Sequence, residues 1–182
     1  MVYPLPAALV SCGSSVEDSN VFTVAWTGTI CSDPAMLYIS VRPERFSYDI
    51  IRKNMEFTLN LTTEALASAT DRCGVMSGRD HNKWKENGLT PKPGIMVSCP
   101  YIEESPLSIE CVVKTIIPLG SHDMFIAEVV NVLADDKYIN AETGAFDLAS
   151  SGLMAYAHGG YYRLGEKLGK FGFSVEKKKK KQ

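Results

Sequence analysis

The chain's β-branched, aromatic and other apolar residues gather in short runs that are separated by turn-forming residues. Runs of this length and composition are typical of β-strands. The sequence predicts six strands, over Ala7–Cys12, Val21–Trp26, Met36–Val41, Met55–Leu61, Leu107–Ile117 and Met124–Leu133. Short turns join several of these runs, and no G-x-G-x-x-G follows a strand. The pattern therefore favours a mainly β, antiparallel barrel with peripheral helices over a doubly wound parallel sheet.

Two or three short helices are expected between the strands. Ser47 is expected to cap the first helix, and Thr63 to cap a second that runs from Glu64 to about Cys73. The stretch from Val75 to Pro106 is rich in glycine, proline and asparagine, with one helical turn expected around Asn82–Glu86. Loops of this length inside a compact domain are often functional.

Length and composition indicate one ordinary globular domain. The chain has 182 residues, of which 45% are hydrophobic and 22% charged, and this balance excludes a disordered or fibrous protein. Lys177–Lys181 form an unbroken basic run, and without its five charges the net charge of −2 becomes −7. An acidic body gives no support to nucleic-acid binding. We expect a folded domain over residues 1–176 and a disordered, lysine-rich tail over 177–182, with contact to anionic lipid or nucleic acid as the alternative for the tail.

The cysteines and histidines match no metal or disulfide pattern. The five cysteines include no C-x-x-C pair, and none of the three histidines pairs with a cysteine at metal-ligand spacing. No metal is expected, and an odd number of cysteines favours a reducing compartment. The sequence shows neither the start of a signal peptide nor the ~20 apolar residues of a membrane span. It thus predicts a soluble, cytoplasmic protein without a membrane partner.

The segment from Asn20 to Pro34 is the first candidate site. Alternation along one continuous strand places small and hydroxyl-bearing residues on one face, namely Thr23, Ala25, Thr27 and Thr29. Such a face permits the close approach of a polar, planar ligand. On the pattern alone, a solvent-facing strand edge is the simpler interpretation.

Arg42 and Ser47 form the second candidate site, because a cation beside a helix start is the outline of a phosphate site. An ion pair between Arg42 and Glu44 is an equally good interpretation. Within the long loop, Lys83 adds a second charge and Trp84 a flat apolar wall, although exposed loop lysines usually face solvent.

Several short motifs follow one another in an order that indicates a family. They are N-x-x-T-x-A-W-T-G at 20–28, S-D-P at 32–34, S-V-R-P at 40–43, F-S at 46–47, F-T-L-N at 57–60, S-G at 77–78, N-K at 82–83, G-S-H-D-x-F at 120–125 and Y-x-x-L-G-E-K-L-G-K-F-G-F-S at 161–174. Each motif is weak alone, but their succession resembles the flavoredoxin branch of the flavin-reductase-like, FMN-binding split-barrel family. The resemblance covers the chain from about residue 4 to residue 174.

The resemblance implies a six-stranded, antiparallel Greek-key split barrel that forms a homodimer, with FMN near the subunit interface. Carried over to this chain, the implied FMN-binding residues are Asn20, Thr23, Ala25, Trp26, Thr27, Cys31, Ser32, Asp33, Ser40, Val41, Arg42, Ser47, Ser77 and Lys83. Thr27, Cys31 and Ser32 would lie beside the ring and the ribityl chain. Arg42, Ser47 and Lys83, with Ser40, would hold the ribityl and phosphate end. For Cys31, a small buried residue is a better interpretation than a reactive thiol.

His122 is the candidate catalytic residue, because an imidazole near a flavin orients a nicotinamide or supplies a proton. An exposed histidine at a hairpin tip is the alternative. Tyr161 and Tyr162 are expected either to cover a flavin face or to pack in the core or a dimer interface.

The resemblance implies an FMN-binding redox protein. The main function that the resemblance implies is an NAD(P)H-dependent flavin or ferric reductase, with hydride transfer to flavin N5. The alternatives are a flavoredoxin-type electron carrier with tightly bound FMN, or a cofactor-free dimeric interaction module. The electron acceptor would be a redox partner protein or a small molecule.

Overall fold

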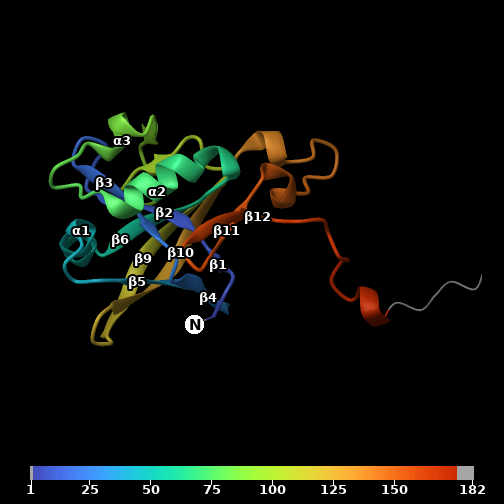
Figure 1. Ribbon diagram of the computed structural model, residues 1–182, viewed down its shortest axis with the longest axis horizontal. Helices are drawn as coiled ribbons and strands as arrows, with labels where there is room; N and C mark the ends of the chain where they lie inside the picture. Colours follow the sequence, from blue (N-terminus) through green and yellow to red (C-terminus); the bar gives the residue numbers. More distant parts are fainter. Residues whose placement is uncertain (1, 176–182) are drawn as a thin grey trace, which may run out of the picture.

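A seven-stranded antiparallel sheet dominates the computed structural model, which describes residues 2–175. The strands of this sheet are β2 (Ala8–Gly13), β3 (Ser19–Val24), β4 (Thr27–Ser32), β5 (Ala35–Val41), β6 (Glu56–Leu61), β9 (Leu107–Pro118) and β10 (Asp123–Ala134). They run in the order β3-β2-β6-β9-β10-β5-β4 (Figure 1). Two small sheets accompany it, formed by β1 (Leu5–Pro6), β11 (Met154–Ala157) and β12 (Gly160–Arg163), and by β7 (Pro91–Lys92) and β8 (Tyr101–Ile102).

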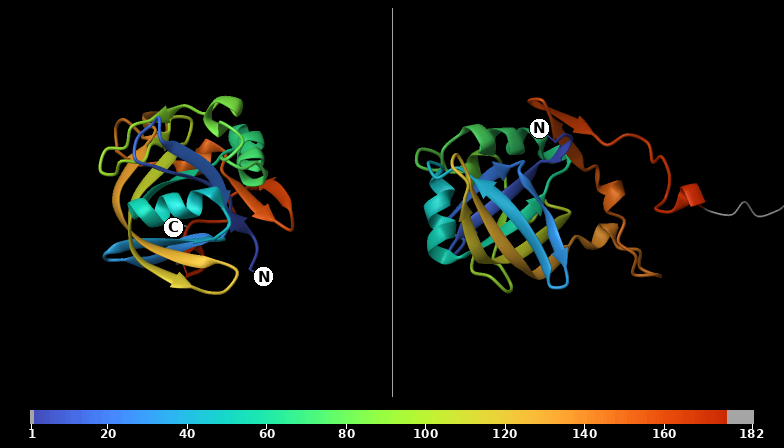
Figure 2. Two further views of the ribbon diagram at one scale, coloured as in Figure 1. Left: turned by 90° about the vertical axis from the view of Figure 1, so that its left-hand side faces the viewer. Right: turned by 90° about the horizontal axis from the view of Figure 1, so that it is seen from below.

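Short helices fill the connections between the strands. They are α1 (Phe46–Asn54), η1 (Glu64–Leu66), α2 (Ala67–Val75), α3 (Lys83–Glu86), η2 (Asp136–Tyr138), η3 (Leu148–Ser151) and η4 (Phe173–Val175). Helix α1 lies across one end of the curled sheet (Figure 2) and buries Tyr48 and Ile51 there. Helix α2 packs on the outer side of β3 and β2.

The sheet curls into a barrel because its two edge strands are consecutive in the chain. Only Ala25 and Trp26 separate the end of β3 from the start of β4. The Ser40 N–H of β5 donates to the Trp26 carbonyl at 2.9 Å, which holds this two-residue link beside β5. Two register shifts between β9 and β10, next to Ala127 and Asn131, add the local twist that bulges produce.

Apolar side chains fill both sides of the first strands. Inside the barrel, Val10, Phe22, Ile39, Phe57 and Phe125 belong to one buried cluster. A second cluster lies between the outer side of β2 and β3 and the helices, and consists of Leu9, Val21, Leu66, Ala69, Cys73, Trp84, Leu89 and Ile102. Because β2 is covered on both faces, every residue from 8 to 13 is buried.

Asn60, from the F-T-L-N motif, ties the covering segments to this buried surface. Its amide nitrogen donates to the Leu9 carbonyl at 3.0 Å and to Ser11 Oγ at 3.1 Å. Its oxygen accepts from the Ile102 N–H at 3.0 Å and from Ser108 Oγ at 2.8 Å. Asn60 is fully buried, and these partners satisfy both ends of its side chain.

The predicted fold class, a mainly β antiparallel barrel, is confirmed, with seven strands in the main sheet rather than six. The added strand is β4, because the predicted Val21–Trp26 strand ends at Val24 and the chain crosses to the opposite edge. The expected helical turn is present as α3, where Asn82 accepts from the Lys85 N–H at 3.1 Å. The predicted tail over 177–182 lies outside the described residues.

The predicted cap of the first helix was wrong. Helix α1 begins at Phe46, so Ser47 is its second residue; Arg45 is the N-cap residue and makes no side-chain capping bond. Thr63 is the N-cap residue of η1, at the predicted position, but makes no side-chain capping bond, and α2 continues past Gly74 to Val75. Among residues 2–175, none of the helices combines the length and the apolar character that a membrane span requires.

Candidate functional site

Two adjoining cavities open where β3 and β5 end and α1 begins. We call the first, of about 450 Å³, the aromatic cavity, and the second, of about 510 Å³, the basic cavity. The aromatic cavity is lined by Ala7, Phe22, Thr23, Val24, Ala25, Trp26, Ser40, Val41, Arg42, Arg45, Asp71, Gly74, Val75, His122, Tyr156, Gly159 and Tyr161. The basic cavity is lined by Asn20, Phe22, Arg42, Glu44, Arg45, Phe46, Ser47, Val75, Met76, Ser77, Gly78, Arg79 and Lys83. Phe22, Arg42, Arg45 and Val75 are common to both, so the two cavities form one groove.

Flat side chains line the aromatic cavity. The rings of Trp26 and His122 lie 4.4 Å apart and are tilted by 35°, while those of Tyr156 and Tyr161 lie 5.5 Å apart. The Tyr161 hydroxyl donates to Asp71 Oδ1 at 3.2 Å. Burial, followed by the Asp71 carboxylate, raises the pKa of Tyr161 to about 12, so the phenol stays protonated at neutral pH.

His122 is also uncharged at neutral pH. Partial burial, followed by the positive charge of Arg42, lowers its pKa from the ordinary value of 6.5. Ser121 Oγ lies 3.0 Å from Nδ1 of the His122 ring. The cavity therefore has aromatic and hydroxyl groups in its wall, and its positive charge comes from Arg42 and Arg45, which it shares with the basic cavity.

Arginine side chains surround the basic cavity. Arg45 donates to the Gly74 carbonyl at 2.8 Å, and Arg79 lies over the Phe46 ring at 5.7 Å. Arg42 pairs with Glu44 at 3.4 Å, but both side chains are more than half exposed, so this pair is weak. Glu44 is the one carboxylate in the cavity wall. The cavity thus has an excess of positive charge.

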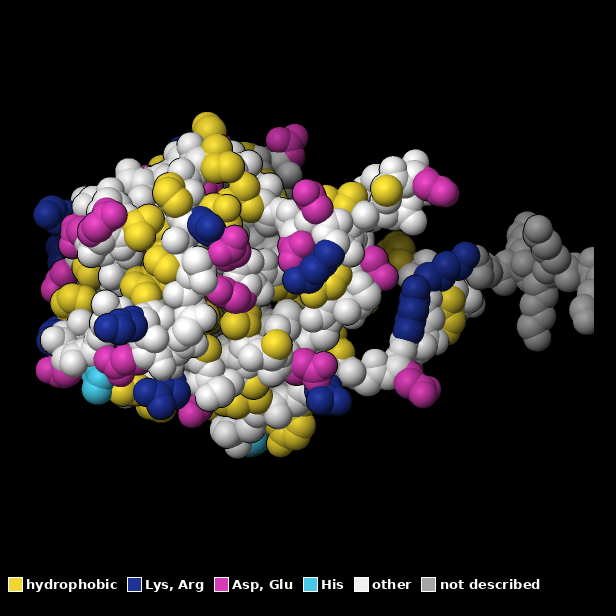
Figure 3. Space-filling model, turned by 90° about the horizontal axis from the view of Figure 1, so that it is seen from above, with side chains coloured by type: hydrophobic (Ala, Val, Ile, Leu, Met, Phe, Trp, Pro, Cys, Tyr) yellow, Lys and Arg dark blue, Asp and Glu magenta, His cyan; other side chains and the backbone are white. Residues whose placement is uncertain are grey.

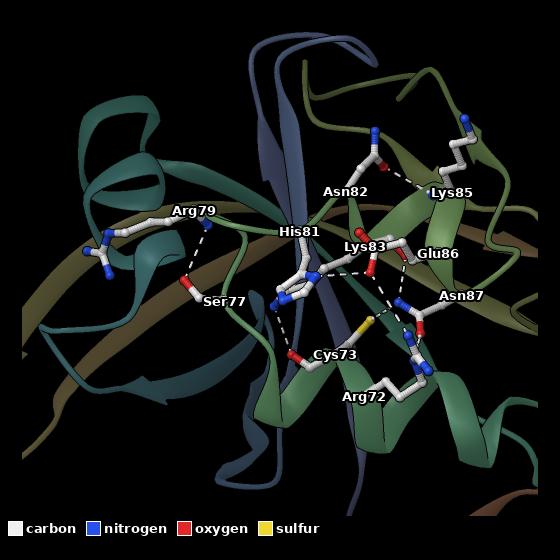
Figure 4. Close-up of polar contacts among 10 residues, drawn as sticks. All are labelled: Arg72, Cys73, Ser77, Arg79, His81, Asn82, Lys83, Lys85, Glu86 and Asn87. Atoms are coloured by element: carbon white, nitrogen blue, oxygen red, sulfur yellow. Dashed lines mark hydrogen bonds and ion pairs between the residues drawn. The ribbon is translucent and has the colours of Figure 1, made fainter.

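Lys83 is the most unusual residue of the basic cavity, because only 3% of it is exposed. Its ammonium donates to the Cys73 carbonyl at 2.9 Å (Figure 4), and within residues 2–175 no carboxylate lies within ion-pair distance. Burial lowers the pKa of Lys83. A buried cation without a counter-charge is costly, and a bound anion would supply that charge.

The start of α1 completes the basic cavity. No side chain caps this nine-residue helix, so the N–H groups of Phe46 and Ser47 are left for another acceptor, while the Tyr48 N–H donates to the Arg45 carbonyl at 3.0 Å. Asn20 donates to Ser47 Oγ at 2.7 Å and fixes that hydroxyl. A side chain on Gly78 would collide with Asn20 and lie 2.7 Å from Phe46, so only glycine fits there. Cations, hydroxyls and a helix start together match a phosphate monoester.

Most of the sequence-predicted site residues line this groove. They are Asn20, Thr23, Ala25, Trp26, Ser40, Val41, Arg42, Ser47, Ser77, Lys83 and His122. Tyr161 lines it as well, whereas Tyr162 lies outside it. Lys83, expected to face solvent on general grounds, is buried.

The hairpin of β4 and β5 carries the predicted residues that the groove does not include, namely Thr27, Cys31, Ser32 and Asp33. The Thr27 hydroxyl donates to the Tyr38 carbonyl at 2.6 Å, and the Cys31 thiol to the Asp33 carbonyl at 3.3 Å. The predicted single face of Thr23 to Thr29 was wrong, because alternation holds only within one strand and the strand ends at Val24.

Sequence reasoning missed Arg45, Arg79, Gly78 and Tyr156. Arg45 directly precedes α1, and Gly78 follows Ser77 in the S-G motif, so these two had a local signal. Arg79 and Tyr156 come to the groove only through the fold, from the long loop and from the β11–β12 hairpin.

Comparison with known proteins places the chain in a family. Residues 1–165 match the family described as flavin reductase like domain. The chain belongs to the flavin reductase-like family. The flavoredoxin of Desulfovibrio vulgaris (Miyazaki F) is similar to it with 30% identity and a TM-score of 0.87, over 97% of this chain and 95% of that chain. The resemblance seen in the sequence motifs is thereby confirmed.

Other relatives agree on the fold. An FMN-binding protein from Thermus thermophilus, solved with bound 1-cyclohex-2-enone, has 22% identity and a TM-score of 0.80 over 92% of this chain and 90% of that chain. An uncharacterised protein of Archaeoglobus fulgidus is 28% identical over 137 residues, which cover 75% of this chain and 76% of the relative. The predicted split-barrel fold is therefore confirmed.

The charge relation between Arg42 and His122 gives a testable prediction. Replacing Arg42 with glutamine (Arg42→Gln) should raise the pKa of His122 toward 6.5, because one of the three causes that lower it is removed while burial and the charge of Arg45 remain. NMR titration of the imidazole protons in the flavin-free protein measures this shift. Arg52→Gln, an exposed change on α1, serves as the control. An unchanged or lower pKa in Arg42→Gln would contradict the assignment.

Proposed function

We propose that this protein binds FMN in the groove and acts as an NAD(P)H-dependent flavin or ferric reductase. The observation that carries the proposal is Lys83, a buried ammonium that lacks a carboxylate partner among residues 2–175 and lies next to a slot walled by aromatic rings. Membership of the flavin reductase-like family supports a flavin-dependent redox function.

The two cavities fit the two ends of FMN. A flat, largely apolar ring system suits the aromatic cavity, where Trp26, Tyr156 and Tyr161 provide the walls. A phosphate dianion suits the basic cavity, where Arg42, Lys83 and the start of α1 would hold it. Ser40, Ser47 and Ser77 supply hydroxyls that suit the ribityl chain between them.

The bound cofactor would supply the ring that accepts and releases electrons, while the protein binds, orients and shields it. Neutral His122 can accept or donate a hydrogen bond at its free ring nitrogen and can carry a proton to or from a substrate beside it. The protonated Tyr161 hydroxyl donates a hydrogen bond to Asp71. This bond fixes the Tyr161 ring in the cavity wall, and the hydroxyl does not exchange its proton near neutral pH. The cations of the basic cavity favour negative charge in the groove.

A flavoredoxin-type electron carrier with tightly bound FMN is the second candidate function. The 30% identity to a flavoredoxin over nearly the whole chain favours it. A cofactor-free interaction module is the weaker alternative, because nothing in such a role calls for a buried, unpaired Lys83. In either redox role, the acceptor is proposed to be a partner protein or a small molecule in the cytoplasm.

Reaction with pyridine nucleotide separates the two redox functions. For a reductase, anaerobic stopped-flow mixing of the flavin-loaded protein with NADH or NADPH should bleach the flavin absorbance within seconds. Loss of absorbance with dithionite is the positive control. No bleaching at millimolar nucleotide would exclude the reductase and leave the electron carrier, whereas a colourless protein that takes up no added FMN would leave the interaction module.

The C-terminal arm, residues 164–175, supports a homodimer. It extends away from the barrel (Figure 1), and Figure 3 shows hydrophobic and basic side chains along it. Leu168 and Phe171 are almost fully exposed, and exposed apolar groups in such a row indicate a protein contact.

For a homodimer, sedimentation velocity should give a particle of twice 20.0 kDa. Leu168→Ser with Phe171→Ser should shift it toward monomer, and a monomeric parent protein would refute the homodimer.

Removing the Lys83 charge should lower the affinity for FMN but not the affinity for riboflavin, which lacks the phosphate. Lys83→Met should weaken FMN binding by about 10- to 100-fold, the effect of losing one charge-assisted hydrogen bond, and leave riboflavin binding nearly unchanged. The melting temperature of the flavin-free variant should stay level or rise, since a buried charge is removed. Flavin fluorescence titration measures both affinities. The control is Lys53→Met, an exposed lysine of α1. Equal losses for both flavins would reject a phosphate role for Lys83.

A further inference from the structure

The β11–β12 hairpin forms one wall of the aromatic cavity without belonging to the main sheet. It pairs with β1 in a separate three-stranded sheet, and Figure 2 shows it as a projection at one side of the barrel. Tyr156, Gly159 and Tyr161 of the hairpin line the cavity, whereas Trp26 and His122 line it from the barrel side. A ligand in the aromatic cavity would therefore contact two parts of the chain that belong to different sheets.

The base of the hairpin is attached to the segment that follows β6. The Glu64 N–H donates to the Gly152 carbonyl at 2.9 Å, and Thr63 forms a β-bridge with Leu153. Arg163, the last residue of β12, forms an ion pair with Glu64. Backbone pairing and charge thus fix the base to the barrel.

The tip of the hairpin has fewer attachments. Its turn residues, His158 and Gly159, have φ values of 48° and 82°, as a tight two-residue hairpin turn requires. The His158 ring contacts Tyr3, which lies just before β1 on the same small sheet. Among residues 2–175, a single hydrogen bond joins residues 155–162 to a segment outside this sheet. It runs from the Tyr161 hydroxyl to Asp71 Oδ1 on α2 and is 3.2 Å long.

An apolar cavity of about 240 Å³ lies between the small sheet and the barrel. Leu5, Pro6 and Met154 line it from the small sheet, and Leu61 lines it from β6. Protein interiors are otherwise close-packed, and side chains beside a void lack the contacts that would hold them. The fixed base, the single bond at the tip and the void together describe an element whose tip moves at low cost.

We propose that the β11–β12 hairpin is a lid over the aromatic cavity, and that the hydrogen bond between Tyr161 and Asp71 keeps it closed. The inference rests on the proposed function, because the ligand that the lid covers is the flavin ring. It adds the step that controls how fast the flavin enters and leaves. A reductase that hands its flavin to another protein needs fast exchange, whereas an electron carrier needs slow exchange. A long hydrogen bond at the protein surface is weak, so this lid opens readily.

Stopped-flow flavin fluorescence with the flavin-free full chain tests the lid by measuring the rates of flavin association and dissociation. Tyr161→Phe keeps the ring in the wall and removes only the hydroxyl. Both rates should rise about three- to tenfold, the effect of losing one surface hydrogen bond, while the dissociation constant changes by less than about threefold. The two rates change together because the ligand passes the same lid in both directions.

Riboflavin and a neighbouring tyrosine provide the controls. Riboflavin should respond to Tyr161→Phe as FMN does, because the lid covers the ring and not the phosphate. Tyr162→Phe should leave both rates unchanged, since Tyr162 is 57% exposed and lies outside the groove.

Replacing Asp71 gives an independent check on the same bond. Asp71→Ala removes the acceptor and should raise both rates as Tyr161→Phe does, and the double variant should show no further rise. Asp71→Asn keeps an oxygen that accepts the hydroxyl and should give intermediate rates.

Two results would overturn the lid while leaving the proposed function intact. A rise in the dissociation rate alone would make Tyr161 a simple contact of the ring, and unchanged rates in Tyr161→Phe and Asp71→Ala would show that the hairpin does not control exchange. A parent protein that binds neither FMN nor riboflavin would refute the proposed function itself, and this inference with it.

Discussion

The site depends on one buried positive charge. Desolvating an ammonium costs several kcal/mol, and the single Cys73 carbonyl that Lys83 reaches does not offset this cost. The fold nevertheless fixes Lys83 through Asn87 and Arg72, so the charge is in place before any ligand arrives. A ligand phosphate would add the missing counter-charge and, by binding only the folded chain, stabilise it. Stability and ligand binding are therefore coupled at this residue.

The position of the groove follows from the way the barrel closes. The chain leaves one edge of the sheet at Val24 and joins the other at Thr27, and between them the hydrogen-bonded ladder is interrupted. Trp26 lies in this gap and uses its carbonyl to hold Ser40. Interruptions of a sheet expose backbone and side chains that a continuous strand would cover, and the aromatic cavity opens beside this one, lined by Val24, Ala25 and Trp26. The basic cavity adjoins the aromatic cavity through Phe22, Arg42, Arg45 and Val75.

Most of the fold could be predicted from the sequence, because the six apolar runs of strand length are six strands of the main sheet. It did not reveal β4 as a separate strand, since Thr27 and Thr29 continue the alternation of the strand before them and only pairing with β5 shows that they belong to another. For the site, Arg42 and Ser47 line one cavity, because both lie close in sequence to one helix start. Burial of Lys83 depends on α2, a contact that no local pattern encodes.

Fixed positive charge lies next to the titratable groups of the groove, because Arg42 and Arg45 line both cavities. At neutral pH the aromatic cavity contains an uncharged imidazole at His122 and an un-ionised phenol at Tyr161. Burial is the first cause of the lowered pKa of His122, and the positive charge of Arg42 is the second, because it disfavours another positive charge there. The same positive charge must favour an electron-rich ligand over an electron-poor one in that cavity. A site with this polarity would stabilise a cofactor more in its reduced, more negative form than in its oxidised form.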